Sequence, residues 1–115
     1  MTANRKTNAK KTGAKNDLGA DLKITKLERR TTSGGAWIRG TIGEYCFDAL
    51  VFSEHADCPD WELGDSRISK LWVARLKNRK TVFHWDRGMD TPATSAKTQA
   101  VVDFLAGELA TRIYG

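Results

Sequence analysis

Few side chains in this sequence have the types and spacing that metal binding requires. The soft metal ligands are two histidines and two cysteines: Cys46, His55, Cys58 and His84. His55 and Cys58 have a usable spacing, but a structural zinc site normally combines two such pairs. Cys46 and His84 stand singly in strand-like segments, where a buried thiol or a half-buried imidazole is ordinary. The sequence therefore predicts no metal site.

Hydrolytic chemistry needs a nucleophile with a base, or paired carboxylates in a cleft. The residues available for such a site are Ser66, Ser69, His84, Asp86 and Asp90. No nucleophile-elbow or phosphate-loop pattern accompanies them. We therefore predict a non-enzymatic protein, with no catalytic residues and no cofactor.

Aromatic and basic residues alternate in a way that suits binding. Residues two apart on a strand share a face, so each aromatic residue projects beside its neighbour. Such a face can stack bases and contact phosphates. The alternative is that the aromatic rings form the core beneath a helix. The three pairs are Trp37 with Arg39, Lys70 with Trp72, and Phe83 with Trp85.

The stretch GDSRISKLWVARL, residues 64–76, is the densest of these segments. On a strand, Leu71 and Val73 would point toward a helix, while Lys70 and Trp72 would point the other way. A lysine can extend its ammonium group only from a face that reaches water. We therefore predict a partner-binding surface made of Arg67, Lys70, Trp72 and Arg87.

The segment DRGMD, residues 86–90, ends a strand and turns at Gly88. One interpretation is a tight turn in which Asp86 or Asp90 binds backbone amides and pairs with a nearby arginine. The other interpretation is direct ligand contact, since loops between strands often carry function.

Charge is distributed unevenly along the chain. Residues 1–16 hold five cations and no acid, which accounts for the whole formal charge of +5 and leaves the rest neutral. Residues 54–65 are acidic without a cation, and residues 67–80 are basic without an acid. These two runs either make a dipolar surface that steers a charged partner or face and neutralise each other.

The order of the expected elements defines the fold class. Residues 1–17 lack Val, Ile, Leu and aromatic residues, so we expect a disordered basic tail followed by a single domain over 18–115. Strand patterns and one amphipathic helix then predict an α+β domain. It should be an antiparallel sheet of four or five strands with one C-terminal helix packed on one face. The expected strands lie within 21–32, 36–42, 45–52, 69–76 and 81–86, and the helix spans 96–113. The first of these segments could form a short helix instead of an edge strand.

The compartment follows from what the sequence lacks. No apolar run approaches the ~20 residues of a membrane span, and residues 1–20 have no apolar block typical of a signal peptide. Two cysteines are too few for a disulfide scaffold and fit a reducing compartment. We therefore expect a cytoplasmic protein without a membrane partner.

Residues 37–90 resemble a small family found in phages, plasmids and related mobile elements. Its pattern is W-x-x-G-x-I-x-x-Y-x-F-x-A, then G-x-x-R-I-S-K-L, then D-R-G-W-D. The matching residues are Trp37, Gly40, Ile42, Tyr45, Phe47 and Ala49, then Gly64 with 67–71, then 86–88. Met89 stands where the family has tryptophan. The resemblance implies a mobile-element setting and brings no catalytic residues.

The resemblance and the residues together predict a binding module that occupies the surface of a host protein or nucleoprotein complex. Small proteins of mobile elements often inhibit host defence, as anti-CRISPR proteins do, so we expect a role of that kind. The alternative is an accessory protein that binds nucleic acid directly through the basic tail and an aromatic-basic sheet face.

Overall fold

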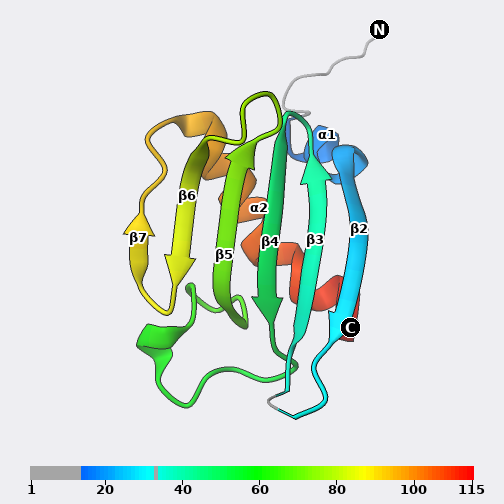
Figure 1. Cartoon of the computed structure of the whole chain (residues 1–115), viewed down its shortest axis with the longest axis vertical. Coiled ribbons are helices and arrows are strands. Elements are labelled where there is room, and N and C mark those ends of the chain that lie inside the picture. The colour runs from blue at the N-terminus through cyan, green and yellow to red at the C-terminus, as the bar shows by residue number, and fades with distance from the viewer. Residues whose placement is uncertain (1–13, 33) are drawn as a thin grey trace, which may run out of the picture.

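The fold is built on a six-stranded antiparallel sheet. Strands that follow one another along the chain are neighbours in the sheet. The computed structural model describes residues 14–32 and 34–115. Figure 1 shows the sheet face on, with one long helix behind it. The strands are β2 (Leu22–Arg29), β3 (Ala36–Ile42), β4 (Tyr45–Val51), β5 (Ile68–Arg75), β6 (Thr81–Asp86) and β7 (Met89–Thr91). The helices are α1 (Ala14–Asp21), the short 3-10 helix η2 (Pro59–Trp61) and α2 (Ala96–Tyr114).

The predicted α+β class is confirmed, with an antiparallel sheet and a C-terminal helix. The predicted number of four or five strands is wrong, because β7 adds a sixth. The chain turns at Gly88, and β7 then pairs with β6 through Trp85 opposite Met89 and His84 opposite Thr91. Three residues are too few to show a strand periodicity, so the sequence does not predict this strand.

The expected domain boundary at residue 18 falls within α1. Of the predicted basic tail, residues 1–13 lie outside the described residues, and residues 14–17 form the first half of α1. Leu18 packs against the core, and a β-carbon at Gly19 would lie 3.8 Å from the Phe104 ring on α2. These contacts attach α1 to the domain, although its sequence has no apolar periodicity to predict a helix.

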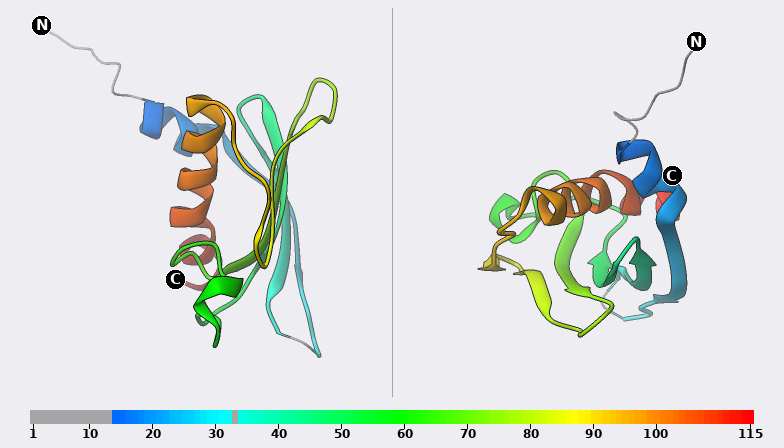
Figure 2. Two further views of the ribbon diagram at one scale, coloured as in Figure 1. Left: turned by 90° about the vertical axis from the view of Figure 1, so that its left-hand side faces the viewer. Right: turned by 90° about the horizontal axis from the view of Figure 1, so that it is seen from above.

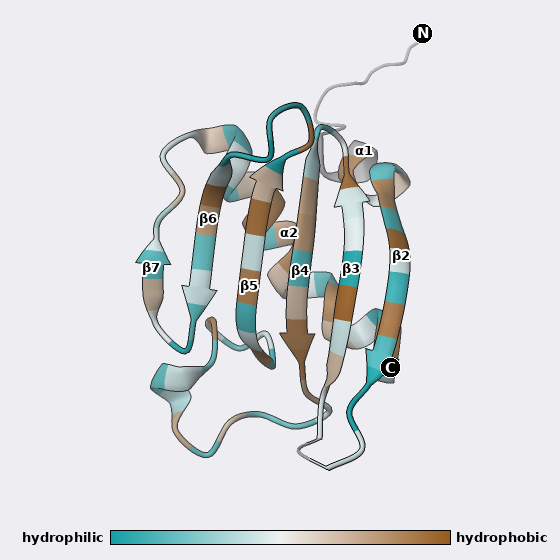
Figure 3. Ribbon diagram, in the orientation of Figure 1, coloured by the Kyte–Doolittle hydropathy of each residue, from teal (hydrophilic) through white to brown (hydrophobic). Residues whose placement is uncertain are grey.

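The core lies between α2 and one face of the sheet. Leu105 and Leu109 on α2 are fully buried, as are Leu71 and Val73 on β5. Figure 2 shows α2 lying across a single face of the sheet, and Figure 3 shows β4 to be apolar along most of its length. None of the helices among residues 14–32 and 34–115 is long and apolar enough to cross a membrane.

Gly40, in the middle of β3, marks a close approach between strands. A β-carbon there would lie 2.3 Å from the backbone oxygen of Lys23 and 2.9 Å from the Phe47 ring. Real β-carbons do not approach backbone atoms so closely, so only glycine fits this position. Its absent side chain lets the Phe47 ring cover the strand, which explains a glycine within a strand.

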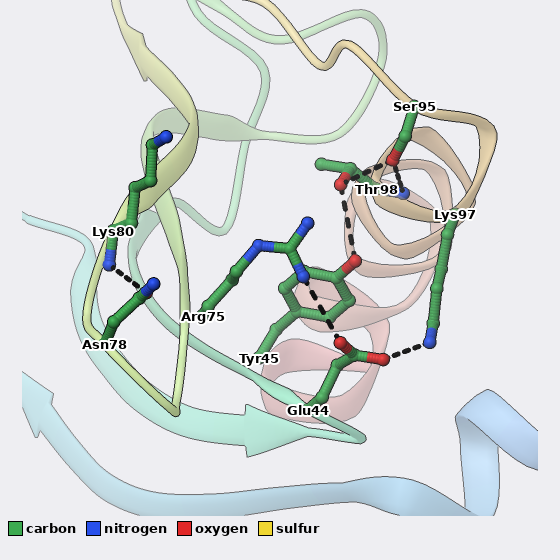
Figure 4. A network of polar contacts seen from close by, with 8 residues as sticks. All are labelled: Glu44, Tyr45, Arg75, Asn78, Lys80, Ser95, Lys97 and Thr98. Carbon is green, nitrogen blue, oxygen red and sulfur yellow. Dashed lines mark hydrogen bonds and ion pairs between the residues drawn. The ribbon is translucent and has the colours of Figure 1, made fainter.

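The start of α2 is fixed by a hydroxyl cap. The Ser95 hydroxyl oxygen accepts a hydrogen bond from the backbone amide of Thr98 at 3.1 Å. The Thr98 hydroxyl also lies 3.4 Å from the Tyr45 hydroxyl, which joins the first turn of α2 to β4 (Figure 4). An amide that would otherwise have no partner is thus satisfied.

The turn between β3 and β4 provides a second connection to α2. Gly43 has a φ of 58° while Glu44 is not left-handed, and a type II′ turn requires these signs of φ. Figure 4 shows the Glu44 carboxylate between Lys97 of α2 and Arg75 of β5. The hydrogen bond and charge of Lys97 lower the pKa of Glu44, and Arg75 adds to that effect.

Candidate functional site

The face of the sheet opposite α2, which we call the open face, is turned toward the viewer in Figure 1. Strand register places its side chains in rows that cross the strands. One row is Glu28, Trp37, Leu50, Lys70 and Asp86. The next row is Lys26, Arg39, Asp48, Trp72 and His84. The predicted orientation of β5 is therefore correct, with Lys70 and Trp72 opposite the buried Leu71 and Val73.

Most charges within these rows are paired. Arg39 Nε lies 2.7 Å from Asp48 Oδ1, Lys70 Nζ lies 3.7 Å from Asp86 Oδ1, and His84 Nδ1 lies 2.7 Å from Asp90 Oδ2. The hydrogen bond and charge of Asp48 raise the pKa of Arg39. Because acids and bases alternate, the open face has little net charge and does not resemble a phosphate-binding surface.

Trp72 is held in place by its neighbours. Its indole Nε1 donates a hydrogen bond of 2.8 Å to the Thr81 hydroxyl, and the Arg79 guanidinium lies 5.7 Å from the ring centroid. Arg79 therefore occupies one side of the ring that a base would stack on. Phe83 is buried against α2, and Trp85 packs beside it. The third predicted aromatic pair thus belongs to the core, whereas the first two lie on the open face.

A groove of about 550 Å³ opens at the end of the sheet where β5 begins. Its walls come from the loop over residues 52–67, the turn before β3, the start of β5 and the turn after β6. Cations and aromatic rings line it together: Arg30, Phe52, Trp61, Arg67, Lys70 and Arg87. Three of the four residues predicted to bind a partner meet in this groove, while Trp72 lies beyond it along β5.

Arg67 and Arg87 share an unusual backbone geometry. Their φ angles are 64° and 54°, in the left-handed region that residues with a β-carbon rarely adopt. Arg79, in the turn between β5 and β6 and outside the groove, has a φ of 61° as well. The Arg67 carbonyl accepts from Phe52 N at 2.8 Å, and Arg87 N donates to Ser69 O at 2.8 Å. The strained conformations are therefore fixed by backbone hydrogen bonds at the groove wall. Such strain tends to gather at functional sites, where the surrounding structure maintains it.

The acidic side of the groove is organised by a buried carboxylate. Glu62 accepts hydrogen bonds from His55 Nδ1 at 2.7 Å and from Ala56 N at 2.8 Å. Burial alone would raise the pKa of Glu62. The hydrogen bonds from His55, Ala56 and the Arg67 amide, with the charge of His55, outweigh burial and lower it. Glu62 thus fixes the loop that carries Glu54 and Asp57 into the groove.

These contacts also show where the two predicted charge runs lie. None of the ion pairs between described residues joins the acidic run to the basic run. Instead Glu54 and Asp57 line the same groove as Arg67 and Lys70. The sequence did not predict the contact between Glu62 and His55, because no local pattern indicates that Glu62 is buried.

The residues considered for metal or hydrolytic chemistry are spread apart or engaged elsewhere. In the part of the chain that the structure describes, no three metal-ligating side chains form a group. Both cysteines are free, and Cys46 is buried with its Sγ 3.6 Å from Ala74 O. The Ser66 hydroxyl is buried and accepts from Ile68 N at 3.0 Å. His84 is bound to Asp90 on the open face.

Comparison of the sequence with models of protein families finds a match. The family model described as "Domain of unknown function (DUF7678)" matches residues 36–110, from β3 almost to the end of α2. The match covers the open face from β3 onward, the groove loop and all three left-handed arginines. No curated protein and no solved structure matches the chain.

Proposed function

The chain belongs to the DUF7678 family, and we propose that it is a non-enzymatic binding module that occupies the surface of a protein or nucleoprotein complex. The observation that carries the proposal is the groove at the end of the sheet. It joins Arg67, Lys70 and Arg87 to the aromatic rings of Phe52 and Trp61. Arginine and aromatic side chains in a concave site are the residues that anchor protein interfaces.

The mixed charge of the groove favours a protein surface over a bare polyanion. Glu54, Asp57 and Glu62 line the same groove as the cations. These carboxylates would repel phosphates, whereas a protein partner offers groups of both signs. The ion pairs of the open face support the same conclusion, because they leave few unneutralised cations there.

We extend the proposal to the setting that the motifs imply. A binding module encoded by a phage or another mobile element would act in the host cytoplasm by covering a working surface of a defence complex, as anti-CRISPR proteins do. The alternative, direct binding of nucleic acid, is favoured by one feature of the sequence. Residues 1–16 hold five cations, which could follow a phosphate backbone.

A double substitution tests the proposal. Lys70→Ala combined with Trp72→Ala removes one side chain that lines the groove and one that lies beyond it on the open face, and it should abolish partner binding. It should also cost less stability than Leu71→Ala, because Leu71 is fully buried. Partner binding is measured by affinity capture from host lysate, with and without nuclease, followed by titration of the purified partner. Arg112→Ala, on the exposed side of α2, is the control and should bind as the wild type does.

Two outcomes would contradict the proposal. One is a folded double variant that retains its partner at full affinity. The other is a wild-type protein that binds oligonucleotides alone with an affinity that falls steeply as salt rises, which would support the nucleic-acid alternative.

A further inference from the structure

The outer edge of β2 is unpaired among the described residues, where β2 is the first strand of the sheet. Figure 1 shows it as the outermost strand on its side. Arg30 donates its amide to Gly35 O at 2.9 Å, toward β3. Backbone groups of successive residues in an antiparallel strand point to opposite sides. The amide and carbonyl groups of Leu27 and Arg29 therefore point outward, away from the sheet.

Two apolar side chains lie beside this free edge. Ile24 and Leu27 are 41% and 47% exposed, although both are on the side of the sheet that faces α2. They project beyond the area that the helix covers. An exposed strand edge with apolar side chains is a template for pairing with another strand.

The sequence of β2 is complementary to itself when two copies run antiparallel about Leu27. That register places Leu27 opposite Leu27 of the second copy, and Lys26 opposite Glu28 in both directions. Lys26 and Glu28 both lie on the open face, so each opposite pair shares a face. Their side chains are 60% and 67% exposed, so a neighbouring copy can reach both charges. Within one copy the two groups lie 3.7 Å apart, so pairs between copies would replace or share this contact.

Backbone geometry agrees with the same register. Leu27 would exchange two hydrogen bonds with its counterpart, because its amide and carbonyl groups both point outward. Lys26 and Glu28 would then form the pairs without hydrogen bonds, in which opposite side chains come closest. The irregularity between Ile24 and Lys26 ends the regular edge, so pairing covers residues 25–29 of each copy.

We propose that two copies of this chain associate through β2, with antiparallel pairing centred on Leu27 and two Lys26–Glu28 ion pairs between the copies. A lysine on an edge strand usually prevents such pairing. Here Lys26 would lie opposite Glu28 of the second copy, so the lysine would attract that strand. The two sheets become one continuous sheet with both copies of α2 on the same side. This inference does not depend on the proposed function of the groove.

Charge reversal with rescue tests the pairing in the full-length chain. Sedimentation equilibrium from about 10 µM to about 1 mM should show a concentration-dependent dimer of the wild type. Lys26→Glu and Glu28→Lys, made separately, should each raise the dimer dissociation constant at least about tenfold, since each replaces two attractions by two repulsions. The double variant should restore the wild-type constant within about threefold. Lys23→Glu changes the charge equally outside the paired register and should have little effect.

Hydrogen exchange provides a second measurement. The Leu27 amide should exchange quickly in dilute protein and become protected at dimer-forming concentrations. A wild type that stays monomeric throughout the range would overturn the proposal. So would single reversals that weaken the dimer no more than Lys23→Glu does, or a double variant that is not restored. Protection of Leu27 in dilute monomer would show that the chain covers its own edge, which also refutes the pairing.

Discussion

Replacing Arg87 by glycine should make the protein more stable while weakening its binding to a partner. Arg87 has a φ of 54° and lines the groove, so its backbone is strained where its side chain is exposed for contact. A side chain kept at a strained position despite its cost in stability is a candidate for function. Arg87→Gly removes both the strain and the guanidinium, so stability and binding should change in opposite directions.

The magnitude follows from three terms. A residue with a β-carbon costs about 1–2 kcal/mol in the left-handed region, and glycine avoids this cost. The greater freedom of glycine in the unfolded chain offsets about 0.5–1 kcal/mol of that gain. The Arg87 to Asp86 contact is 4.0 Å long with an exposed guanidinium, so its loss costs less than about 0.5 kcal/mol. The middle of these ranges gives a net gain of about 0.5 kcal/mol, or about 2–4 °C in the thermal midpoint.

The test compares the urea unfolding of the wild type, Arg87→Gly and Arg87→Ala. Arg87→Ala removes the same guanidinium but keeps a β-carbon, so its stability should stay within about 0.5 kcal/mol of the wild type. Both variants should bind the partner more weakly. If Arg87→Gly is less stable than Arg87→Ala, the left-handed strain is not the controlling term. If both variants bind as the wild type does, Arg87 is not part of the binding surface.

Three other substitutions probe the fold. Leu105→Ala should lower the free energy of unfolding by ~2–4 kcal/mol because Leu105 is fully buried under the sheet, and a change within error in urea unfolding would exclude the two-layer packing. Ser95→Ala should cost ~1 kcal/mol by the same assay, with Ser95→Gly costing only a few tenths. The lowered pKa of Glu62 contributes stability above its unfolded pKa of about 4.5. That contribution is lost as pH falls through the folded pKa, so the stability difference between wild type and Glu62→Gln should shrink between pH 7 and pH 3.

The central part of the fold could be predicted because its periodicity is strong. Along β5, buried Leu71 and Val73 alternate with Lys70 and Trp72, and this alternation was enough to assign both faces. The cap at Ser95 was likewise predictable from local chemistry. By contrast, β7 and α1 depend on tertiary contacts, since neither has an apolar pattern of its own.

The candidate site was predictable only in part for a similar reason. Arg67, Lys70 and Arg87 were identified by residue type, and the sheet brings them to one groove. The assignment of Phe83 required knowing which face of β6 meets the helix, and the alternation of that short strand fits either choice. The left-handed φ of the two arginines had no local signal, because arginine is not a residue that favours this region.

The sequential order of the strands has a consequence for how the protein folds. Neighbouring strands are also neighbours along the chain, so the sheet can form from local hairpins, and contacts of low sequence separation favour rapid folding. Only the step from β4 to β5 must close a long loop, residues 52–67. That loop builds most of the groove, so the groove should be completed late in folding. It should also be the first region to open in local unfolding, while the hairpin of β3 and β4 stays intact.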